Sequence, residues 1–173
     1  MYPRGPVNDQ PCIEGQNPFE IANWFDRANY SITRNGQYRN LWIQGGPRAR
    51  AFFPKTPRAA PALNKVPLVK WHRGYTYVSS THMLLPRGLN LTYDTLGGEK
   101  ASGCLLHAKF LSTMAEKAAE ELERGQHYAD GREYQAYAEG LEDRTDLWNK
   151  WSERFINWRQ LEIMGLMSKG NWA

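Results

Sequence analysis

Two histidines lie in apolar surroundings, and a histidine side chain can bind a metal ion or transfer a proton near neutral pH. His82 lies in YVSSTHMLLP, between a run of hydroxyl residues and an apolar run. His107 follows twenty-five positions later (107 − 82) in LLHAKF, between leucines and an aromatic residue. We predict His82 at the end of a strand and His107 in the first turns of a long helix. Because consecutive elements usually lie side by side, the two side chains are expected to approach a common site.

The same two histidines also fit a purely structural role. A buried histidine can donate its ring N–H to a backbone carbonyl or bond to a nearby hydroxyl group, with no ligand involved. The sequence contains no H-x-x-x-H, C-x-x-C or D-x-D spacing that would indicate a metal site. It also lacks the G-x-S-x-G, P-loop and G-x-G-x-x-G motifs. The residue types alone therefore leave the structural and the functional role open.

The chain of 173 residues has a net charge of +4, and this charge is unevenly distributed. Residues 1–90 contain 12 Lys and Arg against 4 Asp and Glu, whereas residues 91–173 contain 10 against 14. Such halves usually carry solvated surfaces with some internal ion pairs, but a basic half can also hold an anion. Aromatic residues make up 13% of the sequence, which suits a packed core and equally suits stacking on sugars or bases.

The length and the cysteines limit the class of protein. The length fits one domain, and no apolar run reaches the roughly 18–20 residues of a membrane span. The first ten residues, MYPRGPVNDQ, lack the apolar region of a secretory signal. Cys12 and Cys104 lie far apart without metal-ligand spacing. We therefore expect a reduced, cytoplasmic protein, with one structural disulfide as the alternative.

The first part of the chain has the pattern of short strands and loops. Strands are expected over 38–46 and 47–53, and the Gly-Gly between them fits a turn or a backbone that approaches a phosphate or a sugar. A hairpin is predicted over 65–81, with a three-residue connection that ends in Gly74. Pro86 should then stop further pairing, because proline has no N–H to donate.

Helical patterns dominate the second part. A short early helix should begin at Pro18 with Asn17 as its cap, and further helices are predicted over 101–125, 130–141 and 146–166. The last of these has aromatic and apolar residues at steps of three and four, which predicts one buried face formed by Trp148, Trp151, Phe155, Trp158 and Leu161.

The layout indicates an α+β fold in a single domain. Residues 1–100 form its strand and loop part, which has the basic balance, and residues 101–173 form its helical part, with two or three helices.

Six segments of the chain carry a resemblance to a known family. In chain order they are LWIQGGPRARAFF, LNKVPLVKW, YVSSTHMLLP, EKASGCLLHAKF, EKAAEEL and WRQLEIMGLMSKGNWA. Together they resemble bacterial glycosyltransferases of family 2. The resemblance runs from about Met1 to Ala173 and covers the C-terminal half of such an enzyme. The nucleotide-binding half, with its D-x-D motif, is missing from the sequence, so we expect a partial domain.

This resemblance implies a GT-A fold and the transfer of a sugar from a nucleotide-sugar donor to a glycan or lipid-linked acceptor. It also implies a divalent metal ion, Mn²⁺ or Mg²⁺, and we assign His107 first and His82 second to the metal or diphosphate site. Arg48, Arg50 and Lys65 are then candidates for contacts to the donor or the acceptor, or else they form a solvated basic edge. No acidic residue stands out as the catalytic base.

A binding module is the alternative to an enzyme. The basic, aromatic first half would then hold an anionic polymer without catalysis, although the sequence shows no nucleic-acid motif and we expect no nucleic-acid partner. Binding to a polyanion should weaken steeply with salt, whereas a nucleotide-sugar site should need a divalent ion and survive moderate salt. A degenerate remnant with a structural role is a third hypothesis, and peripheral contact with a membrane is compatible with a lipid-linked acceptor.

Overall fold

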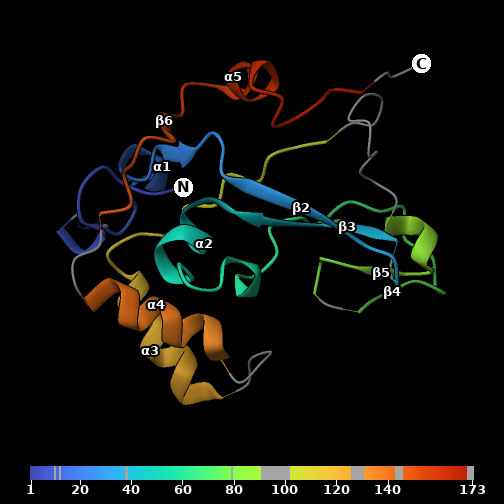
Figure 1. Cartoon of the computed structure of the whole chain (residues 1–173), viewed down its shortest axis with the longest axis horizontal. Helices are drawn as coiled ribbons and strands as arrows, with labels where there is room; N and C mark the ends of the chain where they lie inside the picture. The colour runs from blue at the N-terminus through green and yellow to red at the C-terminus, as the bar shows by residue number, and fades with distance from the viewer. Residues whose placement is uncertain are drawn as a thin grey trace. The chain divides into compact units, whose positions relative to one another are not determined.

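The computed structural model describes residues 1–9, 11, 13–37, 39–78, 80–90, 102–125, 131–142 and 146–170. Small two-stranded sheets and a few helices make up these residues, which confirms the predicted α+β class (Figure 1). The chain divides into two compact units. The first comprises Met1–Asn29, Gly45–Pro61 and Leu105–Ile156, and the second comprises Tyr30–Gln44, Ala62–Cys104 and Asn157–Ala173.

The first unit contains the short helix α1 (Pro18–Ile21) and a sheet of two strands, β1 (Trp24–Asp26) and β6 (Ser152–Arg154). Asn17 caps α1 as predicted, because its side-chain oxygen accepts a hydrogen bond from the N–H of Phe19 at 3.1 Å. The two strands pair antiparallel. This sheet therefore joins the early part of the chain to a segment that follows much later in the sequence.

Helix α2 (Gly46–Phe52) lies where a strand was predicted over 47–53, so that prediction is wrong. Two glycines with positive φ turn the chain into the helix, and Pro47 suits the first turn because its φ is already close to the helical value. The alternation of Ala and Arg suggested a strand. The buried side chains, however, are those of Ala49 and Phe52, whose spacing of three residues places them on one helical face.

Helices α3 (Met114–Arg124) and α4 (Arg132–Glu142) lie side by side (Figure 1). Helix α4 confirms the helix predicted over 130–141, and the residue after α3 is the predicted glycine cap, with a left-handed φ of 61°. The prediction of a helix over 101–125 places the start of this helix too early, because the described residues 102–113 contain no helix. Burial does not support the apolar pattern there, since Leu105 is 74% exposed.

The helix predicted over 146–166 is also wrong. Its middle part forms β6, and only α5 (Trp158–Ile163), in the second unit, is helical. Asn149 and Asn157 explain the break, because their side-chain oxygens accept hydrogen bonds from backbone N–H groups two residues ahead. Trp158 is exposed, so the predicted buried aromatic face does not form.

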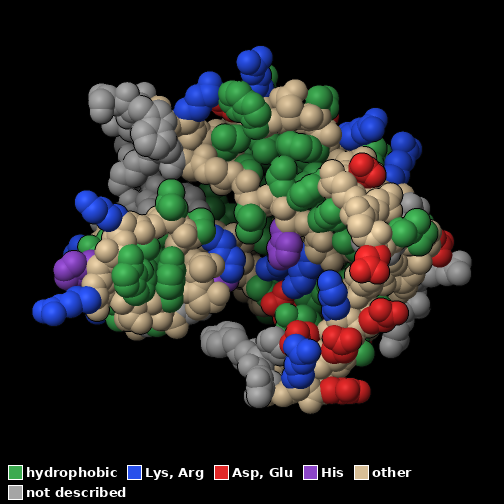
Figure 2. All heavy atoms as spheres, turned by 180° about the vertical axis from the view of Figure 1, so that it is seen from behind, with side chains coloured by type: hydrophobic (Ala, Val, Ile, Leu, Met, Phe, Trp, Pro, Cys, Tyr) green, Lys and Arg blue, Asp and Glu red, His purple; other side chains and the backbone are tan. Residues whose placement is uncertain are grey.

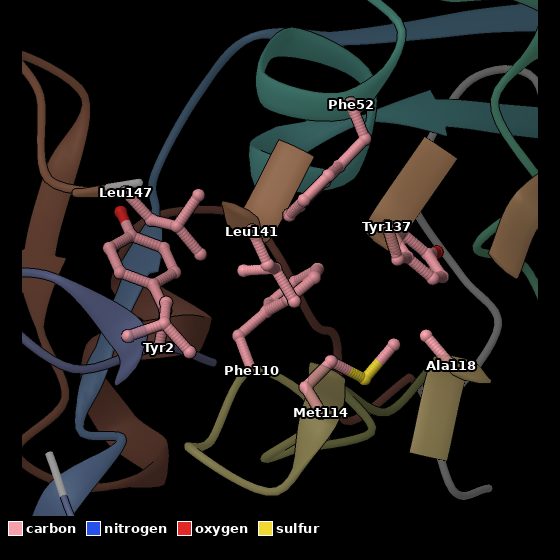
Figure 3. Packing of buried hydrophobic residues seen from close by; sticks show 9 residues of the cluster. Tyr2, Phe52, Phe110, Met114, Ala118, Tyr137, Leu141 and Leu147 are labelled. Carbon is pink, nitrogen blue, oxygen red and sulfur yellow. The ribbon is translucent and has the colours of Figure 1, made fainter. Parts of the chain in front are cut away.

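The core of the first unit gathers side chains from α2, α3, α4 and the segment before α3 (Figure 3). The ring of Phe52 stacks on Phe110 with centroids 5.2 Å apart, and it meets Tyr137 edge-on at 4.9 Å. Gly140 permits this approach, because a Cβ atom there would lie 2.6 Å from a ring carbon of Phe52. The buried members of the core are Tyr2, Val7, Phe52, Phe110, Met114, Ala118, Tyr137, Leu141 and Leu147.

Two small sheets lie in the second unit. Strand β2 (Tyr30–Asn35) pairs with β3 (Asn40–Gly45), and β3 confirms the described part of the strand predicted over 38–46. Strand β4 (Thr76–Tyr77) pairs antiparallel with β5 (Leu84–Leu85). Each sheet joins neighbouring stretches of the chain, in contrast to the sheet of the first unit.

The hairpin predicted over 65–81 is wrong in its first arm. Strand β4 belongs to the second arm, but it pairs forward with β5. Pro67 has no N–H to donate, which interrupts a ladder in the first arm. A backbone hydrogen bond between the two arms does form, from the N–H of Val66 to the carbonyl of Thr81 at 2.7 Å. Strand β5 ends directly before Pro86, as predicted.

Short 3₁₀ helices complete the described structure at Val7–Asp9, Pro57–Ala59 and Arg87–Asn90. Within the described ranges, none of the helices combines the length and the apolar composition of a membrane span. Cys104 is a free thiol that donates to the carbonyl of Leu166 at 3.1 Å, whereas Cys12 lies outside the described residues.

Candidate functional site

His82 lies in a turn two residues before β5 in the second unit, and not at the end of a strand as predicted. Both of its ring nitrogens have partners there. Its Nδ1 lies 2.7 Å from the carbonyl oxygen of Asn64, and its Nε2 lies 2.9 Å from Nζ of Lys65. A carbonyl oxygen can only accept, so Nδ1 carries the proton and Nε2 accepts from the lysine ammonium group. The structure thus brings together two residues that the sequence indicated separately.

This arrangement does not fit a divalent metal ion. Metal binding needs the lone pair of a neutral imidazole, and the ammonium group of Lys65 occupies that lone pair on His82. A second positive charge at this position would also be repelled by Lys65. Among the described residues, no three His, Cys, Asp or Glu side chains gather closely enough to hold a metal ion.

Two buried asparagines contact His82, and the ring of Trp42 lies 6.1 Å from the His82 ring between centroids. We call Asn40, Trp42, Asn64, Lys65 and His82 the His82 cluster. The amide of Asn40 donates to the carbonyl of His82 at 2.9 Å, and Oδ1 of Asn64 accepts from the N–H of Ile43 at 3.1 Å. Within the described residues, Oδ1 of Asn40 and Nδ2 of Asn64 have no hydrogen-bond partner.

His107 lies in the first unit, and its surroundings differ from the prediction. It precedes α3 in a segment without helix, and its side chain is exposed, so the prediction of a helix-start residue that points into the protein is wrong. Its carbonyl oxygen accepts a hydrogen bond from the amino group of Met1. His82 belongs to the other unit, and the common site of the two histidines stays a prediction.

Arg50 of α2 is committed to a buried network in the first unit. Its guanidinium donates twice to Asp26, from Nε at 2.8 Å and from Nη2 at 3.1 Å, and once more to the carbonyl of Leu147. The hydroxyl of Tyr2 also donates to Asp26 and lies 2.7 Å from Oγ of Ser152. Burial and the hydrogen bond to Asp26 raise the pKa of Tyr2, which keeps its hydroxyl protonated. We interpret Arg50 as a residue that stabilises the fold.

Arg48 lies two residues before Arg50 on the same helix and faces a different group of residues. We call this group the Glu133 cluster: Arg48, Lys109, Glu133, Tyr134 and Tyr137. Nζ of Lys109 lies 2.7 Å from Oε1 of Glu133, and Nε of Arg48 lies 4.0 Å from the same oxygen. The hydroxyl of Tyr137 donates to Glu133, and Nζ of Lys109 lies 4.3 Å from the centre of the Tyr137 ring. The side chains of Arg48 and Lys109 are only 15% and 16% exposed.

The electrostatics of this cluster are dominated by its two cations. Burial alone would raise the pKa of Glu133, but the charge and hydrogen bond of Lys109, the hydrogen bond of Tyr137 and the charge of Arg48 outweigh it and lower the pKa. Burial chiefly raises the pKa of Tyr137, so its hydroxyl remains a donor. One carboxylate thus faces two cations, and the cluster can attract a further negative charge.

Sequence reasoning identified Arg48 but missed the rest of this cluster. Lys109 belongs to LLHAKF, the segment in which the sequence indicated His107 as the candidate. Glu133 and Tyr137 are four residues apart, a spacing that places two side chains on one helical face. That spacing could have indicated that Glu133 and Tyr137 contact each other. Nothing in the sequence shows that Arg48 and Lys109 lie next to Glu133.

Replacing Glu133 by glutamine should lower the free energy of unfolding by about 1–2 kcal/mol near neutral pH, because two partly buried cations lose their carboxylate partner. The lowered pKa of Glu133 means that its contribution is present above the ordinary value of 4.5 and is lost as the pH falls through the lower folded value. The difference between the two proteins should therefore shrink in acid, as measured by denaturant unfolding at neutral and acidic pH.

Glu123, an exposed residue of α3, provides the matched control for this prediction. Glu123→Gln should change the free energy of unfolding by less than about 0.5 kcal/mol at either pH. Equal losses in the two variants at neutral pH would contradict the described role of Glu133.

Comparisons of the chain with protein-family models, with curated proteins and with solved structures give no match. Of the five predicted site residues, Lys65 and His82 contact each other, Arg50 bonds to Asp26, and Arg48 lies in the Glu133 cluster.

Proposed function

We propose that the chain is part of a family 2 glycosyltransferase, and that Arg48 and Lys109 bind the diphosphate of its nucleotide-sugar donor. Two different arguments support this proposal. The six sequence segments that resemble the family support the reaction, and the unpartnered nitrogen of Arg48 supports the anion site. The buried nitrogen of Arg48 is the observation that carries the proposal.

The Nε–H of Arg48 is buried and makes no hydrogen bond to any described residue. Its nearest acidic oxygen, on Glu133, is 4.0 Å away, which is beyond hydrogen-bond distance. An unsatisfied buried donor costs about 1–3 kcal/mol, and more for a charged group. A phosphate oxygen would remove this cost, because guanidinium groups bind phosphate through strong charge-assisted hydrogen bonds.

The size and burial of the cluster favour a compact anion over a polymer. Polymer sites present a groove of positive charge that follows the backbone over several nucleotides or sugars. Here two cationic side chains, Arg48 and Lys109, approach one carboxylate oxygen, and both are largely buried. Lys109 adds a point charge beside the planar fork of Arg48, which suits one or two adjacent phosphate groups.

In the proposed reaction, the hydroxyl oxygen of the acceptor forms a bond to the anomeric carbon of the donor sugar. The bond from that carbon to the diphosphate oxygen breaks, its electron pair leaves with the diphosphate, and the hydroxyl proton passes to a base to which no residue is assigned. Arg48 and Lys109 would stabilise the charge that develops on the leaving group. We derive no step through a metal ion, because the described residues around His82 do not fit one.

Replacing Arg48 by methionine should weaken the binding of uridine diphosphate by about 10- to 100-fold, because one charge-assisted contact is lost. Calorimetric titration of the full chain measures this change. The variant should remain folded with a melting temperature close to that of the original chain, because loss of the attraction to Glu133 at 4.0 Å is offset by removal of an unsatisfied charged donor. Arg48→Lys, which keeps the charge but not the fork, should lose part of the affinity.

Lys117→Met, on the exposed face of α3, serves as the control and should bind uridine diphosphate like the original chain. Equal affinity of the Arg48→Met variant and the original chain would contradict the proposed site. Absence of nucleotide binding, together with tight and steeply salt-dependent binding of a soluble polyanion such as dextran sulfate, would instead favour the binding module.

A further inference from the structure

The second unit presents large apolar side chains to solvent on one short segment, residues 67–78, which we call the 67–78 loop. Leu68 is 91% exposed, Trp71 is 58% exposed and Val78 is exposed as well. Single exposed apolar residues are common on protein surfaces, but a group that includes a tryptophan more often marks a contact surface. The 67–78 loop therefore needs an explanation that the proposed donor site, in the first unit, does not supply.

Aromatic side chains within this loop pack on one another. The ring of Trp71 stacks on Tyr77 of β4, with centroids 6.2 Å apart and planes inclined by 26°, and it meets Tyr75 edge-on at 6.3 Å. The hydroxyl of Tyr77 donates to the carbonyl of Val66 at 2.8 Å, which connects the end of the loop to the buried residue that precedes it. The three rings thus form one packed, partly exposed aromatic surface. Leu68 precedes Trp71 by three residues in the sequence.

The charge around the loop is strongly positive. Lys70 and Arg73 lie in the loop itself, and the sequence contains no Asp or Glu between residues 27 and 93. The described part of the second unit holds eight Lys and Arg residues against one Glu. At the left of Figure 2, on the side where β4 and β5 lie, a patch of hydrophobic side chains is bordered by Lys or Arg and His side chains. An apolar centre with a basic border is complementary to a surface that combines hydrocarbon with negative charge.

We propose that the 67–78 loop docks the chain on the surface of a membrane that contains anionic lipids. Tryptophan and tyrosine prefer the interface between lipid and water, where an aliphatic side chain such as that of Leu68 can enter the hydrocarbon region. Lys70 and Arg73 would then pair with anionic headgroups, which attract nearby basic residues. A nucleic acid would use the basic residues but offers no favourable environment for Leu68, and the membrane is therefore the partner that matches every part of the loop.

Flotation with lipid vesicles tests this proposal on the full chain. Vesicles of equal parts phosphatidylcholine and phosphatidylglycerol should bind the chain, whereas vesicles of phosphatidylcholine alone should bind it much more weakly. Leu68→Ser and Trp71→Ser should each weaken binding about tenfold, because each removes an inserted apolar side chain. Lys70→Gln and Arg73→Gln should each weaken it about fivefold.

Two controls separate this surface from the donor site and from exposed apolar residues in general. Leu105→Ser removes a strongly exposed leucine of the first unit and should leave vesicle binding unchanged. Arg48→Met should also bind vesicles normally, so that failure of the donor site and failure of the membrane surface can be told apart. Melting temperatures should be unchanged in Leu68→Ser, since that side chain has almost no contacts to lose.

Three outcomes would overturn the proposal. The first is equal vesicle binding by the original chain and by the Leu68→Ser and Trp71→Ser variants. The second is a loss of self-association in those variants without any vesicle binding by the original chain, which would assign the loop to a second copy of the chain. The third is no preference for anionic over neutral vesicles together with tight binding of single-stranded nucleic acid, which would assign the basic residues to that polymer.

Discussion

Replacing Asp26 by asparagine is expected to lower the free energy of unfolding by about 3–5 kcal/mol, because the change leaves a partly buried guanidinium without its counter-charge. Asp26 is fully buried and accepts hydrogen bonds from both Arg50 and Tyr2. An asparagine of the same shape can accept fewer of these bonds, and it cannot balance the charge of Arg50. Denaturant unfolding, read from the fluorescence of the tryptophans, measures the loss.

The ion pair between Arg27 and Glu153 offers the control. Nη1 of Arg27 and Oε2 of Glu153 lie 3.9 Å apart at the surface. Glu153 lies in β6, and Arg27 directly follows β1 of the same sheet. Glu153→Gln should cost less than about 1 kcal/mol, because exposed ion pairs contribute little. A loss from Asp26→Asn as small as this would show that the buried network does not hold the first unit together.

Leu141→Ala should lower the free energy of unfolding by about 2–5 kcal/mol, since it removes a fully buried side chain and leaves a cavity in the core. Leu141 lies on α4 in the cluster that contains Phe52 and Phe110 (Figure 3). The matched change is Leu122→Ala, at an exposed position of α3, and it should cost under about 1 kcal/mol. Thermal and denaturant unfolding of both variants measure the difference, and equal costs would contradict the described core.

Local signals predicted the ends of several elements correctly. Asn17 before Pro18 gave the start of α1, and a glycine gave the end of α3, because capping depends on residues that are close in sequence. The pattern of apolar residues was less reliable. It predicted a helix over 146–166, where β6 instead pairs with β1, and no local pattern reports a partner that lies so far away in the sequence.

The same limit applies to the site. His82 and Lys65 were both singled out, but the sequence did not show that the lysine occupies the ring nitrogen a metal would need. Arg48 was singled out as well, whereas its neighbours Lys109 and Glu133 come from two other segments of the chain. The chemistry of a cluster is set by such long-range contacts, and only the fold brings them together.

The central claim is that the Nε–H of Arg48 binds a diphosphate, and the nuclear magnetic resonance signal of that N–H group tests it most directly. The signal can be assigned as the arginine Nε–H resonance that is missing from the Arg48→Met variant. Adding uridine diphosphate to the original chain should shift this resonance and slow its exchange with water, because a buried donor gains a hydrogen bond to a phosphate oxygen. A resonance that stays unchanged at nucleotide concentrations that saturate binding would contradict the claim.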